Sequence, residues 1–128
     1  MRETKLWTWF MLAGLVILVL LGLHMLVAHM GGLTGIGVAD RTADSVTEAN
    51  SQARDAGLFY PIVYLILLAA ALFHGLYGLR VILFELGLKM GAQKAVNALL
   101  LLLGLGLFGF GSWGIFAAHA AALQAGRG

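Results

Sequence analysis

Three long apolar segments, separated by polar ones, dominate the pattern of hydrophobic and polar positions along the chain. They cover residues 6–30, 58–86 and 95–123. At 1.5 Å per residue, a helix of about 20 residues crosses a hydrocarbon core of about 30 Å. The pattern therefore predicts three transmembrane helices, an all-α integral membrane fold, and a single membrane domain over residues 1–128.

A secretory signal is the alternative interpretation of the first segment, because Arg2 and Lys5 precede it. The apolar stretch is much longer than a typical signal sequence, and no A-x-A cleavage site follows it. We therefore interpret residues 6–30 as a retained span.

A polar segment, residues 31–57, separates the first two spans. Its charged residues are Asp40, Arg41, Asp44, Glu48, Arg54 and Asp55. Small apolar residues recur every three or four positions, at Ala43, Val46, Ala49, Ala53 and Ala56. Ser45 and Glu48 have the spacing of a capping box. The segment is therefore predicted to hold a short surface helix.

The positive charges favour one orientation in the membrane. Residues 87–94 form a short connection between the second and third spans. This connection contains Lys89 and Lys94, and the N-terminus contains Arg2 and Lys5. The positive-inside rule places both regions in the cytoplasm, with the polar segment and the C-terminus outside. Aromatic residues typical of membrane interfaces lie near span ends, at Trp7, Trp9, Tyr60 and Tyr64.

The composition excludes several classes of protein. Of the 128 residues, 61% are hydrophobic, 11% are charged and none is cysteine. So few charges exclude an ordinary soluble enzyme. The absence of cysteine excludes a disulfide framework, a Cys-ligated zinc site and an iron–sulfur cluster held by this chain alone. A net charge of +2 gives no reason to expect nucleic-acid binding.

Glycines are frequent in the third span, at Gly104, Gly106, Gly109, Gly111 and Gly114. They permit close approach of another helix. We favour packing within the chain over a dedicated partner-binding face.

The four histidines are the main candidates for chemistry, because ionisable groups inside a bilayer are costly. His24 is expected about 25 Å, and His74 about 18 Å, from the cytoplasmic ends of their spans. His24 and His29 point about 140° apart around the helix and cannot share a metal ion. His24 is the deeper and better ligand candidate, whereas His29 and His119 are expected at the outer interface.

The surroundings of His74 suggest a haem site. Small residues lie one turn away on either side, at Ala70 and Gly78, and Ala71 and Gly75 flank the same stripe, leaving a flat slot for a porphyrin. Arg80 is placed to reach a haem propionate or a quinone carbonyl by snorkelling. Packing hydrogen bonds and proton relay remain alternatives for His74 at this point.

Residues 74–85, with the sequence HGLYGLRVILFE, resemble a segment of a known family. The segment is similar to the second span of the smaller membrane anchor of succinate dehydrogenase (succinate:quinone oxidoreductase, complex II), an SdhD-like cytochrome b subunit. The first span resembles the same family around Gly14 and the run Gly22-Leu23-His24. The order of three spans, an outside loop and a short inside connection extends the resemblance over nearly the whole chain.

The resemblance implies a haem b held between two anchor chains, with one axial histidine from each. His74 matches the haem-ligand position, and His24 matches the first-span histidine linked to a second haem in some relatives. It also implies a quinone near the cytoplasmic end of the second span, close to Arg80. Glu85 takes the place of the family's common aspartate, Leu86 follows where many relatives have tyrosine, and Tyr77 lies farther back along the helix.

The resemblance further implies a larger two-chain anchor bundle in a prokaryotic plasma membrane. The partners would be a second membrane-anchor subunit, an iron–sulfur subunit and a flavoprotein subunit, with membrane lipid around the bundle. Two other functions remain open from the residues: a haem-free structural anchor, and a small proton-conducting component in which His24 and His74 relay protons.

Overall fold

The computed structural model describes the backbone of residues 2–34 and 47–126, and the side chains of residues 3–29 and 47–126. Within these ranges the chain is helical and has no strand. The helices are α1 (Arg2–Thr34), α2 (Glu48–Asp55), α3 (Phe59–Glu85) and α4 (Met90–Ala125). The predicted all-α class with three long helices is confirmed.

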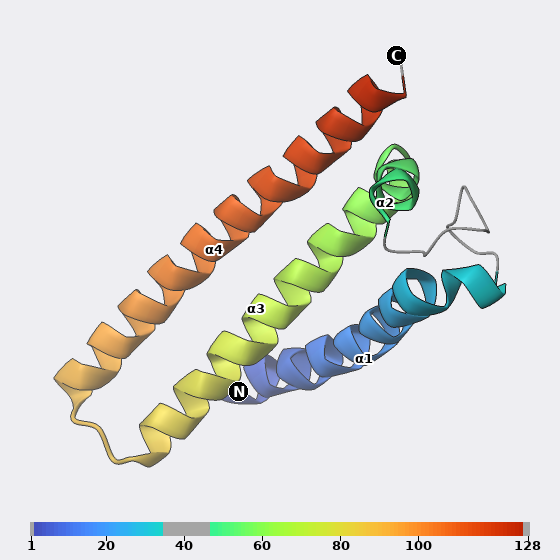
Figure 1. Cartoon of the computed structure of the whole chain (residues 1–128). Helices are drawn as coiled ribbons and strands as arrows, with labels where there is room; N and C mark the ends of the chain where they lie inside the picture. The colour runs from blue at the N-terminus through green and yellow to red at the C-terminus, as the bar shows by residue number, and fades with distance from the viewer. Residues whose placement is uncertain (1, 35–46, 127–128) are drawn as a thin grey trace.

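Helix α3 is the centre of the arrangement, because both α1 and α4 pack against it (Figure 1). In the described ranges no Cα atom of α1 lies within 8 Å of a Cα atom of α4. The start of α1, the end of α3 and the start of α4 share one end of the bundle, which we call the N-terminal end (Figure 1). Helix α2 packs against α4 and α3 at the opposite end, which we call the α2 end.

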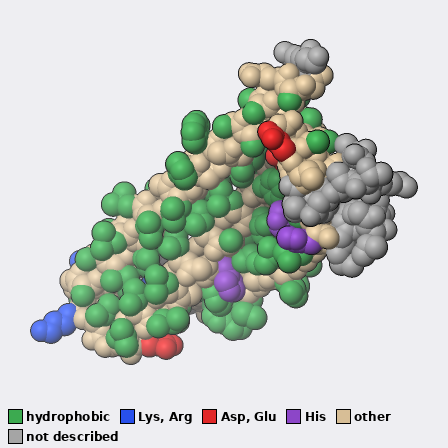
Figure 2. All heavy atoms as spheres, in the orientation of Figure 1, with side chains coloured by type: hydrophobic (Ala, Val, Ile, Leu, Met, Phe, Trp, Pro, Cys, Tyr) green, Lys and Arg blue, Asp and Glu red, His purple; other side chains and the backbone are tan. Residues whose placement is uncertain are grey.

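Among the described residues, three helices are long and apolar enough to cross a membrane: Glu3–His29, Phe59–Glu85 and Met90–Ala125. Many of their large hydrophobic side chains point outwards; Leu18 and Phe110, for example, are each 72% exposed. Figure 2 shows hydrophobic side chains along the length of the bundle, with Lys and Arg side chains visible at one end. Such a surface suits hydrocarbon rather than water, as expected of an integral membrane protein.

The turn between α3 and α4 is shorter than the sequence predicted. Gly87 adopts a φ of 72°, which a residue with a side chain rarely does. Helix α4 then begins at Met90 rather than near residue 95. The side-chain amide of Gln93 donates to the Leu88 carbonyl at 2.9 Å. The hydropathy pattern placed the start too late because Gln93 and Lys94 are good helix formers that continue the helix beyond the apolar stretch.

The short helix predicted in the polar segment is present as α2, but its start and its inward face differ from the prediction. The helix begins at Glu48 after Thr47, whose side chain makes no capping hydrogen bond. Glu48 is therefore the first helical residue and not the third position of a capping box with Ser45. The side chains that α2 buries are Asn50 and Arg54. The small residues of the expected apolar face, Ala49 and Ala53, are exposed. Ser45 lies outside the described residues, as do Asp40, Arg41, Ala43, Asp44 and Val46.

The glycines of α4 divide into two groups. A Cβ atom at Gly104 would lie 2.8 Å from a Leu76 methyl group, and one at Gly111 would lie 2.7 Å from a Leu68 methyl group. These two glycines allow α4 to approach α3 closely, as expected. Gly106, Gly109 and Gly114 have open space where a side chain would stand. Packing within the chain therefore explains only part of the glycine pattern.

Candidate functional site

His74 lies between α3 and α1. Its Nδ1 atom is 3.0 Å from the Phe10 carbonyl oxygen. Because a carbonyl only accepts, Nδ1 carries the proton and donates it, which leaves the lone pair of the neutral ring on Nε2. The imidazole also stacks on the Phe10 ring, with centroids 4.1 Å apart and planes 5° from parallel. These two contacts fix both the tautomer and the orientation of a half-buried histidine.

The small residues around His74 meet different neighbours. On α1, a Cβ atom at Gly14 would lie 3.0 Å from His74 Cε1, so the ring fits against bare backbone. The Phe10 ring covers Gly78, at 3.3 Å from a Cβ built there. Gly75 has open space, and Ala71 is exposed. The flat slot expected along this stripe is therefore partly occupied by α1 and remains open on the side of Gly75.

His24 lies on the same α1–α3 interface as His74, toward the α2 end. Its ring meets Tyr64 edge-on, with centroids 5.5 Å apart. On α1, His24 faces Tyr64 and Gly14 faces His74. Gly14 and His24 are ten positions apart on α1, and Tyr64 and His74 are ten positions apart on α3. The two levels of the interface are therefore about 15 Å apart. The sequence placed both histidines inside spans but did not reveal that they share one interface.

A small cavity of about 230 Å³ adjoins His24 and is lined by residues of α1, α2 and α3, among them Tyr60, Tyr64 and Arg54. Arg54 is only 7% exposed and hydrogen-bonds to Ser51 at 3.1 Å. In the sequence, Arg54 stands only as one of the charged residues of the polar segment predicted to hold a short surface helix. Its i, i+4 spacing from Asn50 was the available signal, because buried polar residues at that spacing share one helix face.

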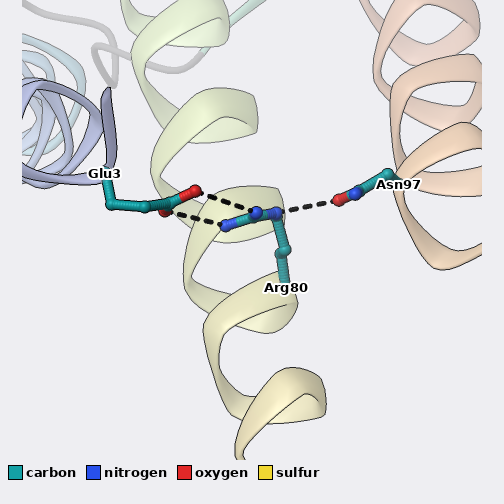
Figure 3. A network of polar contacts seen from close by, with 3 residues as sticks. All are labelled: Glu3, Arg80 and Asn97. Carbon is teal, nitrogen blue, oxygen red and sulfur yellow. Dashed lines mark hydrogen bonds and ion pairs between the residues drawn. The ribbon is translucent and has the colours of Figure 1, made fainter. Parts of the chain in front are cut away.

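Arg80 joins all three long helices at the N-terminal end (Figure 3). Its Nε donates to Asn97 Oδ1 at 2.8 Å, and its two terminal nitrogens lie 3.4 Å from the two Glu3 carboxylate oxygens. The guanidinium also stacks over the Phe84 ring, 4.4 Å from its centroid. We call this cluster the Glu3–Arg80–Asn97 clamp. Neither Glu3 nor Asn97 was singled out in the sequence, although an asparagine in an apolar helix is a recognisable signal for a polar partner.

The other residues expected near a quinone or haem propionate lie at different depths. Tyr77 is 8% exposed, and its ring contacts both Phe10 and Phe73. Glu85 is the last residue of α3 and is exposed at the N-terminal end. The structure thus brings Tyr77 and Arg80 together, with 5.7 Å between the guanidinium carbon and the ring centroid, and leaves Glu85 apart at the helix end.

The remaining histidines lie toward the α2 end and differ from each other. His29 is exposed. His119 Nδ1 hydrogen-bonds to the Asp55 carbonyl at the end of α2, so it ties α4 to α2. Burial raises the pKa of the Asp55 carboxyl above its ordinary value of 3.8, while Arg54 and His119 act in the opposite direction. The expectation of a headgroup-exposed residue fits the exposure of His29, whereas His119 makes a specific contact.

Within the described side chains, no group of three or more His, Cys, Asp or Glu residues is arranged to hold a metal ion. A metal centre built on His74 or His24 would therefore need further ligands from a porphyrin or from a second chain. The ring nitrogens of His74 suit this arrangement, because Nδ1 is occupied by backbone and Nε2 carries the lone pair.

Comparison with known proteins gives one informative relative. The chain is 32% identical over 114 residues to a succinate dehydrogenase hydrophobic membrane anchor subunit from Archaeoglobus fulgidus, and the match covers 89% of each protein. No family model and no solved structure matches the chain. The match therefore extends over most of the chain, in agreement with a resemblance that covers nearly its whole length. The chain therefore belongs to the family of hydrophobic membrane anchor subunits of succinate dehydrogenase.

Proposed function

We propose that this complex II anchor holds a haem b, with His74 as one axial ligand and a histidine of a second anchor subunit as the other. A bound haem would supply one-electron redox chemistry within the membrane. The complete enzyme would add an iron–sulfur subunit and a flavoprotein subunit, and electrons from succinate would reach a membrane quinone. The role of this chain would be anchoring, ligation and part of the quinone surroundings.

The observation that carries the proposal is the hydrogen bond between His74 Nδ1 and the Phe10 carbonyl. Histidines that bind metals commonly donate their second ring nitrogen to a carbonyl or carboxylate, which fixes the tautomer and orients the ring. The open space beside Gly75 adds a surface without side chains next to the ligand. The resemblance of residues 74–85 to the haem-binding segment of the family also supports the proposal.

We also propose His24 as the ligand of a second haem. The ring lies at a second level of the α1–α3 interface and lines the cavity that also contains Arg54. That cavity, at about 230 Å³, is smaller than the about 300–1,000 Å³ usual for sites of drug-sized ligands. A porphyrin would therefore require the α2 end to open or a second chain to complete the site.

For quinone, we propose a position near the N-terminal end of the bundle, formed together with partner chains. Tyr77 is buried by aromatic neighbours, and Arg80 is engaged by Glu3 and Asn97. Glu85 is the most accessible candidate on this chain. The positive charges at this end support a cytoplasmic location, and a prokaryotic plasma membrane remains the proposed site of the complex.

A haem-free anchor is the second candidate, and the same contacts favour it. The Phe10 carbonyl satisfies one ring nitrogen of His74, and Phe10 covers one ring face. A histidine that serves only to join α1 to α3 would show both contacts. The two candidate functions therefore differ in whether Nε2 of His74 ligates a haem iron.

A reduced-minus-oxidised absorption spectrum of the purified complex, with haem and protein quantified together, tests the proposal. We expect a b-type signal that His74→Ala removes and that His29→Ala, a matched exposed histidine of α1, leaves unchanged. A second haem lost with His24→Ala would assign that ligand too. An intact complex without a b-type signal would establish the haem-free anchor instead. Unchanged haem in His74→Ala would refute His74 as an axial ligand.

A further inference from the structure

An apolar groove runs along the interface of α3 and α4. It has a volume of about 440 Å³ and is lined mainly by leucine, phenylalanine and small residues of the two helices, with Ala69 and Phe108 at its inner end. Leu101 and Leu105 border it and are 64% and 62% exposed. The groove is thus open to the surrounding hydrocarbon.

The outer end of the groove is polar. Arg80 and Asn97 are among its lining residues, and they belong to the Glu3–Arg80–Asn97 clamp (Figure 3). The side chain of Arg80 is 21% exposed and that of Glu3 is 66% exposed. Both contacts between Arg80 and Glu3 measure 3.4 Å, longer than the about 2.8 Å of a tight charge-assisted hydrogen bond. Glu3 is therefore a weak, solvent-accessible partner that another anion can replace.

The length of the groove matches half of a bilayer. Arg80 lies eleven positions after Ala69 on α3, and Phe108 lies eleven positions after Asn97 on α4. Either distance is about 16 Å, and half of the hydrocarbon core is about 15 Å. The clamp is consequently at the level where lipid headgroups meet the hydrocarbon when the inner end of the groove is at the midplane.

We propose that this groove binds one acyl chain of an anionic phospholipid, with the phosphate on Arg80 and Asn97 in place of Glu3. A guanidinium pairs well with phosphate because its fixed N–H donors match the phosphate oxygens. The described side chains at the N-terminal end also carry an excess of positive charge, which attracts anionic lipid; the cations are Lys5, Arg80, Lys89 and Lys94, and the acidic residues are Glu3 and Glu85. A neutral quinone carbonyl would interact with the Arg80 guanidinium less strongly than a phosphate does, and would therefore replace the Glu3 carboxylate less readily.

Native mass spectrometry of the full chain in detergent tests the proposal, with equal amounts of phosphatidylglycerol and phosphatidylcholine carrying the same acyl chains. We expect the anionic lipid to be retained about tenfold more than the zwitterionic one. Arg80→Gln should abolish this preference, whereas Glu3→Gln should increase it, because the competing carboxylate is gone. Opposite effects of two substitutions in one clamp cannot arise from misfolding. Lys89→Gln, at the same end but outside the groove, is the charge control.

A second pair of variants tests the groove itself. Ala69→Phe should fill the inner end and reduce retention of both lipids, whereas Ala118→Phe, an exposed alanine of α4 outside the groove, should not. Equal retention of the two phospholipids by the unmodified chain would overturn the proposal. So would a preference that survives Arg80→Gln, or displacement of the lipid by a neutral isoprenoid quinone. None of these outcomes depends on whether His74 binds haem.

Discussion

Replacing Gly14 with leucine tests how closely the orientation of His74 depends on a bare backbone opposite it. The new Cβ would lie 3.0 Å from His74 Cε1 and 3.3 Å from Nδ1. Ordinary carbon contacts are about 3.5–4.0 Å, so the ring must retreat by roughly 0.5 Å even before the rest of the leucine is placed. The ring also donates to the carbonyl of Phe10, one turn before Gly14 on α1, so a retreat of this size from α1 takes the 3.0 Å hydrogen bond to the limit of about 3.5 Å.

The expected cost is that of overpacking, about 1–3 kcal/mol, which corresponds to a roughly 5–150-fold change in an equilibrium constant. Thermal unfolding of the purified chain in detergent, followed by loss of helical circular dichroism, measures the stability. Under the proposed haem ligation, a b-type absorption of the complex would report the state of the ligand. Gly22→Leu is the matched control on the same helix, because a side chain there meets nothing within 4 Å. Equal stability and equal haem content in the two variants would refute the close fit of His74 against Gly14.

Three further outcomes follow from other contacts. Asp55→Asn should unfold at a higher temperature than the parent at neutral pH, because burial raises the pKa of this carboxyl and its charge destabilises the folded chain. The difference in unfolding temperature should vanish as the pH falls toward 3.8. A difference that does not depend on pH would contradict this cause. His119→Phe should speed amide hydrogen exchange in α2 by removing a hydrogen bond worth about 0.5–1.5 kcal/mol, whereas His29→Phe should leave it unchanged, as exchange measured by mass spectrometry would show. Gly111→Leu should destabilise the chain by about 1–3 kcal/mol in thermal unfolding because it meets a leucine of α3, and Gly109→Leu, which faces open space, should be tolerated; similar losses in both would refute the division of the glycines.

Hydropathy predicted the fold because spanning helices must satisfy their backbone polar groups internally and expose apolar side chains to lipid. It could not place the start of α4, since Gln93 and Lys94 favour a helix whether or not they lie in the membrane. It also misassigned the inward face of α2. Small alanines carry little preference for either side, and the buried residues, Asn50 and Arg54, are polar. Local periodicity is a weak guide where a helix buries polar groups.

The histidine positions followed from sequence, but their contacts did not. His74 could be singled out by its small neighbours, whereas its bond to Phe10 joins residues 64 positions apart. Arg80 and Glu3 are separated by 77 positions, and a carboxylate in the first turn of the chain resembles an ordinary solvated charge. Such contacts depend on which helix faces which, and one sequence with three apolar helices does not determine that pairing.

The distribution of polar contacts explains why the three-helix chain remains open on its sides. In lipid, apolar packing between helices gains little, so hydrogen bonds and close contacts determine how helices associate. The described part of the chain has such ties at both ends: the Glu3–Arg80–Asn97 clamp at one and the His119 contact to α2 at the other. Between them, the described backbones of α1 and α4 stay more than 8 Å apart at their Cα atoms, and an apolar opening of about 480 Å³ lies among the three long helices. Polar contacts at the two ends can hold the helices in register while the middle of the bundle stays accessible. The proposed completion of a site around His74 by a second anchor chain would require this accessibility.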